Sequence, residues 1–317
     1  MTGMSCLVTG GAGFIGSHLT DRLVRDGHRV RVVDNLSTGD ERNLDQARNR
    51  IDFVIGDLTD PAVCRAVVRD VEVIFHLAAL PSVPRSMQDP WGSYRHNVEA
   101  TMHLLLAARE AGARRIVYSS SSSVYGDTPT LPKVESVEPL PRSPYAAAKL
   151  AAEQFVLAFA RAGMIEGVAL RYFNVFGPRQ SPMSAYAAVI PLFLAAARDG
   201  TPAQINGDGL QTRDFTYVDN VVEANLLAAT RPADKVSGVP FNVGAGGRTS
   251  LLDLLGMVSN VMGRNVSAEH RPPRPGDVKD SLASLDRAEA GLGYRVLVSL
   301  PEGLKRTWGW FQAAQGS

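Results

Sequence analysis

The chain of 317 residues is long enough for one large domain or for two domains that pack closely together. It is 45% hydrophobic and 21% charged, as globular proteins are, and its formal net charge of +1 gives no reason to expect a nucleic-acid or membrane partner. The two cysteines, Cys6 and Cys64, lie in apolar segments and need not pair, so we expect a cytoplasmic location. The His, Cys, Asp and Glu residues show no metal-ligand spacing, so we expect no metal site. We also expect no signal peptide and no membrane span, because the longest apolar run, 185–197, is short and contains Pro191.

The stretch 5–34 has the order of strand, glycine-rich turn, amphipathic helix and second strand that binds dinucleotides. Gly10 permits a tight turn, Gly13 leaves room for a pyrophosphate beside the backbone, and Gly16 lets the helix pack close to the strand. The phosphates would then lie at the positive end of the helix. Asp34 ends the second strand 34 − 16 = 18 residues after Gly16, where a carboxylate can bind both ribose hydroxyls and repel a 2′-phosphate. The stretch therefore predicts a site for NAD rather than NADP.

Strands and helices alternate as far as residue 172. Apolar runs predict strands at 51–55, 71–77, 115–119 and 168–171, and helical spacing predicts helices at 61–69, 91–111 and 145–162. This alternation is typical of a Rossmann α/β fold, a doubly wound parallel sheet covered by helices on both faces. We therefore expect a NAD-binding Rossmann domain at 1–172.

The pattern changes after residue 172. An irregular segment at 173–182 precedes helices predicted at 187–198, 219–229, 250–262 and 301–311 and short strands at 204–209 and 240–243. This order predicts a smaller α/β substrate domain at 173–209 and 245–317, with the chain crossing back to the sheet near 210–244.

A tyrosine and a lysine lie one turn apart at the start of the helix predicted at 145–162. Ser143 is a good N-cap residue and Pro144 suits the first helical position, so Tyr145 and Lys149 share one face. A free tyrosine, with a pKa of about 10, is a poor base at neutral pH, but a neighbouring ammonium group favours the phenolate. Tyr145 could then accept a proton from a sugar hydroxyl, while Lys149 holds the nicotinamide ribose. A surface pair without function is the alternative interpretation.

Five consecutive serines, Ser119 to Ser123, follow the strand predicted at 115–119. The carboxyl end of a strand in a parallel sheet is where ligands bind, and a hydroxyl there could bridge Tyr145 and a substrate oxygen. The alternative is a serine turn that satisfies its own backbone. The serines, the dinucleotide stretch and the tyrosine–lysine pair together favour catalysis.

Further motifs extend over nearly the whole chain: RYFNVFG at 171–177, NGDG at 206–209, RDF at 213–215 and RPGD at 274–277. With the motifs above, they resemble the extended short-chain dehydrogenase/reductase superfamily and, within it, the UDP-hexose 4-epimerases. The segments SVPRS at 82–86 and AYAAVIP at 185–191 resemble most the bacterial UDP-N-acetylglucosamine 4-epimerases. Pro81 departs from the glycine usual in that group, which affects the sugar contacts of this loop.

The resemblance implies a role for each matching position. Tyr145 is the base and Lys149 its helper, Ser121 is the catalytic serine, and Ser123 is a second hydroxyl near the sugar. The implied NAD contacts are Gly10, Gly13, Phe14, Ile15, Gly16, Asp34, Asn35, Ser37, Thr38, Gly39, Asp57, Leu58, Leu77, Ala78, Ala79, Asn97, Ser119, Tyr145, Lys149 and Tyr172. The implied UDP-sugar contacts are Ser82, Ser121, Ser123, Asn174, Ala188, Val189, Gln204, Asn206, Arg213, Arg274, Asp277 and Ser281.

The implied activity is that of an isomerase that uses NAD to invert C4 of a UDP-sugar through a 4-keto intermediate. Ser281 matches a position where relatives restricted to glucose and galactose carry tyrosine, and serine leaves space beside C2. We therefore expect UDP-GlcNAc/UDP-GalNAc interconversion, with UDP-Glc/UDP-Gal as a second activity, unless Ser281 is a surface residue without sugar contact. The resemblance also implies a homodimer that pairs through helices at about 91–111 and 145–162.

Three alternatives stay open. UDP-glucuronate 4-epimerisation is less expected, because the sequence shows no dedicated extra arginine beside the sugar. Dehydratases and decarboxylases share the fold, but related dehydratases place Asp-Glu where this chain has Ser122 and Ser123, which cannot act as carboxylates. A dinucleotide sensor or scaffold without activity tends to lose the tyrosine or the lysine, and this chain has both.

Overall fold

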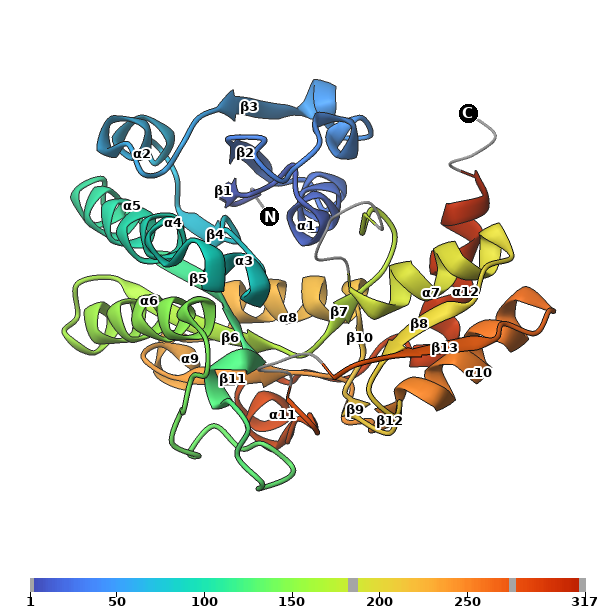
Figure 1. Ribbon diagram of the computed structural model, residues 1–317. Coiled ribbons are helices and arrows are strands. Elements are labelled where there is room, and N and C mark those ends of the chain that lie inside the picture. Colours follow the sequence, from blue (N-terminus) through green and yellow to red (C-terminus); the bar gives the residue numbers. More distant parts are fainter. Residues whose placement is uncertain (1–2, 182–187, 274–277, 314–317) are drawn as a thin grey trace.

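A sheet of seven parallel strands forms the centre of the molecule (Figure 1). The computed structural model describes residues 3–181, 188–273 and 278–313. The strand order is β11-β6-β5-β4-β1-β2-β3, with the bounds β1 Ser5–Thr9, β2 Arg29–Asp34, β3 Ile51–Ile55, β4 Val73–His76, β5 Arg115–Ser121, β6 Glu166–Tyr172 and β11 Pro240–Val243. All neighbouring strands pair in parallel, for example Val8 with Val32 and with Phe75.

Helices cover both faces of this sheet. One apolar core joins Val8 of β1 to α1 (Phe14–Arg25) and α8 (Val218–Thr230). A second core joins Leu7 of the same strand to α2 (Pro61–Val67), α5 (Ala100–Glu110) and α6 (Pro144–Arg161). Successive side chains of a strand point to opposite faces, so two separate cores require two helical layers. The predicted Rossmann α/β fold is confirmed.

Helix α6 begins as the sequence predicts. Ser143 is the N-cap residue, and its hydroxyl accepts a hydrogen bond from the Ala146 N–H at 3.2 Å, while Pro144 occupies the first turn. A capped start fixes the rotation of the helix, and with it the face that carries Tyr145 and Lys149.

The helix predicted at 91–111 has three parts. α4 (Pro90–Tyr94) passes into a π-helical turn, η3 (Arg95–Glu99), and then into α5. The wider turn lets the Asn97 Nδ2 donate to the carbonyls of Ser93 at 2.8 Å and Leu80 at 3.2 Å. A short helix that the periodicity does not predict, α3 (Val83–Gln88), precedes α4. The remaining short helical turns of this half are η1 (Glu41–Leu44), η2 (Arg48–Arg50) and η4 (Ser122–Tyr125).

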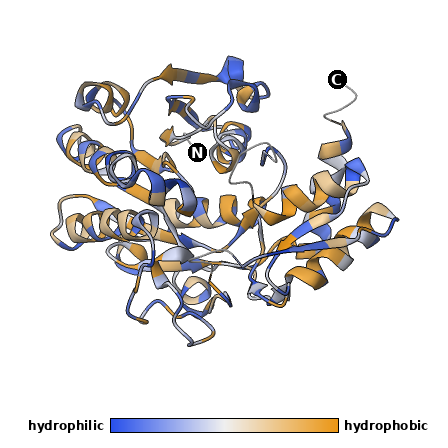
Figure 2. Ribbon diagram, viewed as in Figure 1, coloured by the Kyte–Doolittle hydropathy of each residue, from blue (hydrophilic) through white to orange (hydrophobic). Residues whose placement is uncertain are grey.

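A smaller region packs against the carboxyl ends of the central strands (Figures 1 and 2). Its two-stranded sheets pair β7 (Val175–Phe176) with β10 (Thr216–Tyr217), β9 (Thr212–Arg213) with β12 (Thr249–Ser250), and β8 (Ala203–Asn206) with β13 (Ala268–Arg271). Its helices are α7 (Val189–Asp199), α10 (Leu251–Met262) and α12 (Leu300–Ala313), with α9 (Ala233–Val236) and α11 (Asp286–Leu292) beside β11. The sequence pattern does not predict β13 or α11.

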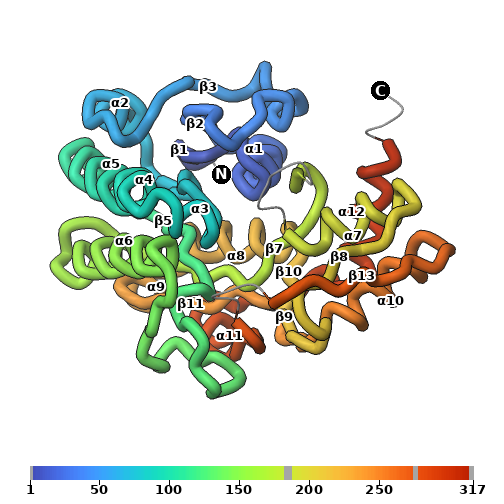
Figure 3. Tube along the Cα trace, viewed as in Figure 1, coloured from blue at the N-terminus to red at the C-terminus, as the bar shows by residue number. Residues whose placement is uncertain are grey.

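The chain leaves this smaller region and returns to the main sheet before the helices α10, α11 and α12 (Figure 3). Strand β11 hydrogen-bonds to β6 with Phe241 opposite Leu170, and α8, the segment before it, is buried along most of its length. Within the described ranges, every helix is too short or too polar to cross a membrane.

Candidate active site

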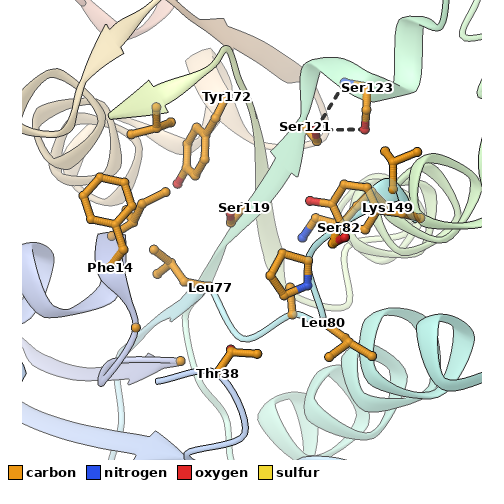
Figure 4. A pocket seen from close by; sticks show the side chains of 18 of the residues that line it. Phe14, Thr38, Leu77, Leu80, Ser82, Ser119, Ser121, Ser123, Lys149 and Tyr172 are labelled. Atoms are coloured by element: carbon orange, nitrogen blue, oxygen red, sulfur yellow. Dashed lines mark hydrogen bonds between the residues drawn. The ribbon is translucent and has the colours of Figure 1, made fainter. Parts of the chain in front are cut away.

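A cavity of about 1300 Å³ lies at the carboxyl ends of β1, β2, β4, β5 and β6. Its walls include the glycine turn after β1, the serine run after β5 and, from the smaller region, Arg213 and Ser281. Figure 4 shows Phe14, Leu77 and Thr38 on one side and Ser121, Ser123 and Lys149 on the other. Open parallel sheets bind their ligands at this edge.

The glycine turn forms a cradle at the start of α1. Gly10 has a φ of +67°, and a Cβ there would lie 2.7 Å from the Ala78 nitrogen, so only glycine fits without movement. A Cβ on Gly16 would lie 2.2 Å from the Gly10 oxygen, which fixes how closely the helix approaches the turn. A Cβ on Gly13 would meet, among described atoms, only the Gly10 oxygen at 3.1 Å, and would otherwise project into open space. The cradle therefore presents backbone N–H groups to an anion at a helix N-terminus.

Asp34 lies at the end of β2, beside this cradle. It is 8% exposed, and its carboxylate accepts hydrogen bonds from the N–H groups of Ala12 at 3.0 Å and Leu36 at 2.9 Å. Burial raises the pKa of this carboxyl, and the backbone N–H groups oppose the rise. A Cβ on Gly39 would lie 3.1 Å from both carboxylate oxygens, so Gly39 keeps the space beside Asp34 open without lining the cavity itself. Next along the chain, Asn35 donates to Asp57 at 2.9 Å.

A buried histidine supports the loop that carries Leu77 and Ala78. His76 lies between the hydroxyls of Thr9 at 2.8 Å and Thr101 at 2.9 Å. The Thr101 hydroxyl donates to the Asn97 carbonyl, so it must accept from the His76 Nε2–H, and Nδ1 then accepts from Thr9. The Ala78 N–H in turn donates to Thr9 at 3.1 Å. Burial, with a contribution from Lys149, lowers the pKa of His76 to about 3, so the ring is neutral.

The serine run, the tyrosine and the lysine meet on the opposite side of the cavity. The Ser121 hydroxyl accepts a hydrogen bond from the Ser123 hydroxyl at 2.9 Å. Burial raises the pKa of Tyr145 to about 12, and the nearby Ser121 hydroxyl opposes this rise. Burial lowers the pKa of Lys149 to about 7, and Glu153 opposes that shift. An amine that titrates near neutrality beside a phenol is suited to proton transfer.

Two distant segments meet on the substrate side of the cavity. The Arg213 guanidinium donates to the carbonyls of Thr212 at 2.9 Å and Lys279 at 3.1 Å, and the Ser281 N–H donates to the Thr212 carbonyl at 3.1 Å. Asn174, at a φ of +28°, donates to the Asp214 carbonyl at 3.3 Å. Arg213, Asn174 and Ser281 thus line one wall together.

Some residues of the predicted site do not line the cavity. Asn97 is 1% exposed and supports the Leu80 carbonyl from behind, and Gln204 is exposed on β8. The Asn206 carbonyl accepts from Gln211 at 2.6 Å in a tight turn, and Val189 begins α7. Arg274, Asp277 and the segment 182–187, which includes part of the AYAAVIP motif, lie outside the described residues. The other predicted residues, apart from Gly39, line the cavity.

Polar residues that the sequence analysis does not single out also line the cavity, among them His96, Lys133, Arg142, Gln180 and Asp280. Lys133 reaches the wall because its N–H donates to the Leu282 carbonyl at 2.7 Å. This long-range pairing leaves no local pattern in the sequence. The sequence does contain a signal for Arg142, because this residue directly precedes Ser143, the N-cap of the helix that carries Tyr145.

Comparisons with known proteins agree with this geometry. The family model described as the NAD dependent epimerase/dehydratase family matches residues 6–244. This chain belongs to that family.

Relatives of this epimerase/dehydratase are similar over their whole length. A UDP-glucose 4-epimerase of Mycolicibacterium smegmatis is 41% identical over 313 residues, which cover 98% of this chain and 99% of that protein. The structure of a UDP-N-acetylglucosamine 4-epimerase from Methanobrevibacter ruminantium M1 in complex with UDP-N-acetylmuramic acid is 38% identical with a TM-score of 0.93, over 99% of this chain and 100% of that one. A UDP-glucose 4-epimerase of Thermus thermophilus in complex with NAD is 34% identical with a TM-score of 0.89, over 98% of this chain and 100% of that one.

Membership of the NAD-dependent epimerase/dehydratase family confirms the predicted family resemblance and the predicted cofactor. The cavity fits NAD: the space beside Gly13 and the N–H groups of the cradle suit a pyrophosphate, and Asp34 suits a ribose with two free hydroxyls. In the described part of the chain, no group of three or more His, Cys, Asp or Glu side chains could hold a metal ion.

Proposed function

We propose that this enzyme interconverts the C4 epimers of UDP-sugars, with UDP-GlcNAc and UDP-GalNAc as its main pair and UDP-Glc and UDP-Gal as a second pair. One observation carries the proposal: Tyr145, Lys149 and the hydrogen-bonded pair Ser121 and Ser123 line the same cavity as the glycine cradle. The relatives named above, which act on UDP-glucose or UDP-N-acetylglucosamine, support the same substrate class.

The proposed proton transfer runs from the sugar 4-hydroxyl to the phenolate oxygen of Tyr145. Bound NAD supplies a nicotinamide ring that takes up hydride from a sugar carbon and returns it. Tyr145 removes the proton of the 4-hydroxyl, and Ser121, whose hydroxyl acts against the rise in the Tyr145 pKa, orients that 4-hydroxyl. An ammonium group on Lys149 would favour the phenolate that this step needs, because a nearby positive charge stabilises the charged form. It would act against the burial that raises the pKa of Tyr145.

The rest of the chain would hold the UDP group while the sugar turns over. We assign this role to the smaller region, 173–209 and 245–317, with Asn174 as a described contact, and to Arg213 of the adjoining segment 210–244. A guanidinium is suited to a diphosphate because it offers several fixed donors. Ser281, on the same wall, leaves room for an N-acetyl group.

We also propose a homodimer. α4 and α5 pack against α6, and these helices leave large apolar side chains uncovered: Trp91 is 68% exposed, Tyr94 46% and Phe155 41%. The rings of Trp91 and Tyr94 stack with their centroids 5.3 Å apart, which enlarges the apolar surface. A self-complementary patch of this kind suits a twofold axis. Sedimentation as a monomer at micromolar concentration would refute this assembly.

The decisive experiment is a turnover panel of UDP-Glc, UDP-GlcNAc and UDP-GlcA, run on the wild type and on Tyr145→Phe. General base catalysis contributes roughly 10²–10⁴-fold, so the variant should lose at least about 100-fold in turnover and keep its bound NAD. Tyr217→Phe, at a tyrosine that lines neither the cavity nor the proposed dimer patch, is the matched control. Retained activity in Tyr145→Phe, or a stable 4-keto-6-deoxy product from the wild type, would overturn the proposal.

A further inference from the structure

A buried ion pair lies one helical turn after Lys149. Glu153 shares a face of α6 with Lys149, and its side chain is 0% exposed, while that of its partner Arg171 on β6 is 3% exposed. Arg171 Nη2 donates to Glu153 Oε1 at 2.6 Å, and Arg171 Nε donates to Oε2 at 3.0 Å. The Ser120 hydroxyl donates to Oε2 at 2.6 Å. Three donors from β5 and β6 thus hold the carboxylate in one place.

This ion pair is not explained by stability alone. A buried pair is often no more stabilising than apolar side chains of the same volume, because both charges lose their water. Here, moreover, Arg171 Nη1 is buried without a hydrogen-bond partner in the described part of the protein. The guanidinium lies 4.8 Å from the centroid of the Tyr125 ring, which offsets part of that cost. A pair with an unsatisfied donor, directly behind a cavity, indicates a role beyond packing.

Lys149 needs a negative group, because its surroundings disfavour a charge. It is 2% exposed, and its Nζ lies 4.7 Å from the centroid of the Tyr118 ring. Its titratable neighbours on β4 and β5 are His76 and Tyr118, and Tyr145 of its own helix and Tyr172 of β6 line the same cavity. His76 is neutral, and burial raises the pKa of all three tyrosines above the ordinary value. Glu153 is the charged group that raises the pKa of Lys149 against burial.

We propose that Glu153 is a positioning residue for the reaction: its carboxylate, fixed by Arg171 and Ser120, keeps Lys149 in the ammonium form beside Tyr145. Lys149 and Glu153 are four apart on α6, so their side chains are neighbours on one face of the helix, whereas Arg171 reaches Glu153 from the sheet. The inference rests on the proposed roles of Tyr145 and Lys149.

The direct test is the titration of Lys149 itself. The chain has only five lysines, Lys133, Lys149, Lys235, Lys279 and Lys305, so the Cε signals of lysine-labelled protein can be followed by NMR, with Lys149→Met as the assignment control. Glu153→Gln should lower the pKa of Lys149 by roughly one unit, since an opposite charge within about 4–6 Å shifts a pKa by roughly 1–3 units and Arg171 cancels part of the field. The alkaline limb of kcat/KM should move to lower pH by the same amount.

Two further variants separate this role from a structural one. Glu166→Gln breaks the ion pair with Arg115 at the other end of β6, where the two groups are 2.6 Å apart, and should leave the Lys149 titration unchanged. The double variant E153M/R171M avoids an unpaired buried arginine and should recover stability while the Lys149 pKa stays low. An unchanged Lys149 titration in both Glu153 variants overturns the proposal, even if activity falls. A lowered pKa of Lys149 in these variants supports the proposal, whether or not the wild type turns over UDP-sugars. Absence of turnover in the wild type would instead refute the proposed function.

Discussion

Gly13→Ala separates cofactor binding from folding. Gly13 has φ −76° and ψ 176°, a conformation that alanine adopts freely, and the added Cβ meets only the Gly10 oxygen at 3.1 Å among described atoms. Alanine loses less backbone entropy on folding than glycine does, which stabilises the variant by about 0.4–1 kcal/mol. Alanine is also a poorer N-cap residue than glycine, which destabilises the variant by a similar amount. The free energy of unfolding of the NAD-free protein should therefore change by less than about 1 kcal/mol.

The same methyl group projects into the space proposed for the pyrophosphate. Forcing atoms into a packed site costs roughly 1–3 kcal/mol, so NAD should bind about 5- to 150-fold more weakly. Calorimetric titration of NAD-free protein would measure the affinity, and urea unfolding the stability. Gly309→Ala on α12, where a Cβ meets no described atom within 4 Å, is the matched control and should leave NAD affinity unchanged. Wild-type affinity in Gly13→Ala would refute the assignment of the cradle.

Two other predictions concern the sugar and pH. Ser281→Tyr should depress turnover of the N-acetylated pair about 10- to 100-fold and spare UDP-Gal, measured as kcat/KM; an equal fall for both pairs would exclude Ser281 as the determinant. The folded-state pKa of His76, about 3, lies below its ordinary value of about 6.5, so its contribution to stability is complete above pH 6.5 and is lost as the pH falls towards 3. A histidine with such a shift changes the free energy of unfolding by up to about 1.4 kcal/mol per pH unit in this range. Urea unfolding between pH 7 and 5 should therefore show a weaker dependence of the free energy of unfolding on pH in His76→Gln than in the wild type. An unchanged dependence would contradict the buried neutral ring.

Local sequence patterns predict the parts of the molecule that are set by local chemistry. The glycine turn requires residues without a side chain at Gly10 and Gly16, and α6 begins where Ser143 and Pro144 favour a helix start. These two patterns place the cradle and the tyrosine–lysine face, which are the larger part of the candidate site.

Pairings between distant segments leave no such pattern. Arg213 and Ser281 lie on one wall because the Arg213 guanidinium and the Ser281 N–H both donate to the Thr212 carbonyl. Ser281 is 281 − 212 = 69 residues from Thr212 along the chain. The π-helical turn at 95–99 accommodates the hydrogen bond from Asn97 to the Leu80 carbonyl. Hydrophobic periodicity does not record such a contact, so it predicts one continuous helix there. In the sequence, Glu153 and Arg171 cannot be distinguished from surface charges, because their pairing depends on how α6 packs against β6.

The position of β11 also affects how the chain folds during synthesis. Strand β6 ends at Tyr172, but its outer partner begins only at Pro240, 240 − 172 = 68 residues later. At about 5–20 residues per second, a ribosome needs roughly 3–14 seconds to make that segment, and β6 meanwhile has an unpaired edge. An uncovered edge of seven mostly buried residues is a template for pairing with another nascent chain. Fragments that end before Pro240 keep that edge permanently, so truncation between residues 173 and 239 exposes the Rossmann half to aggregation.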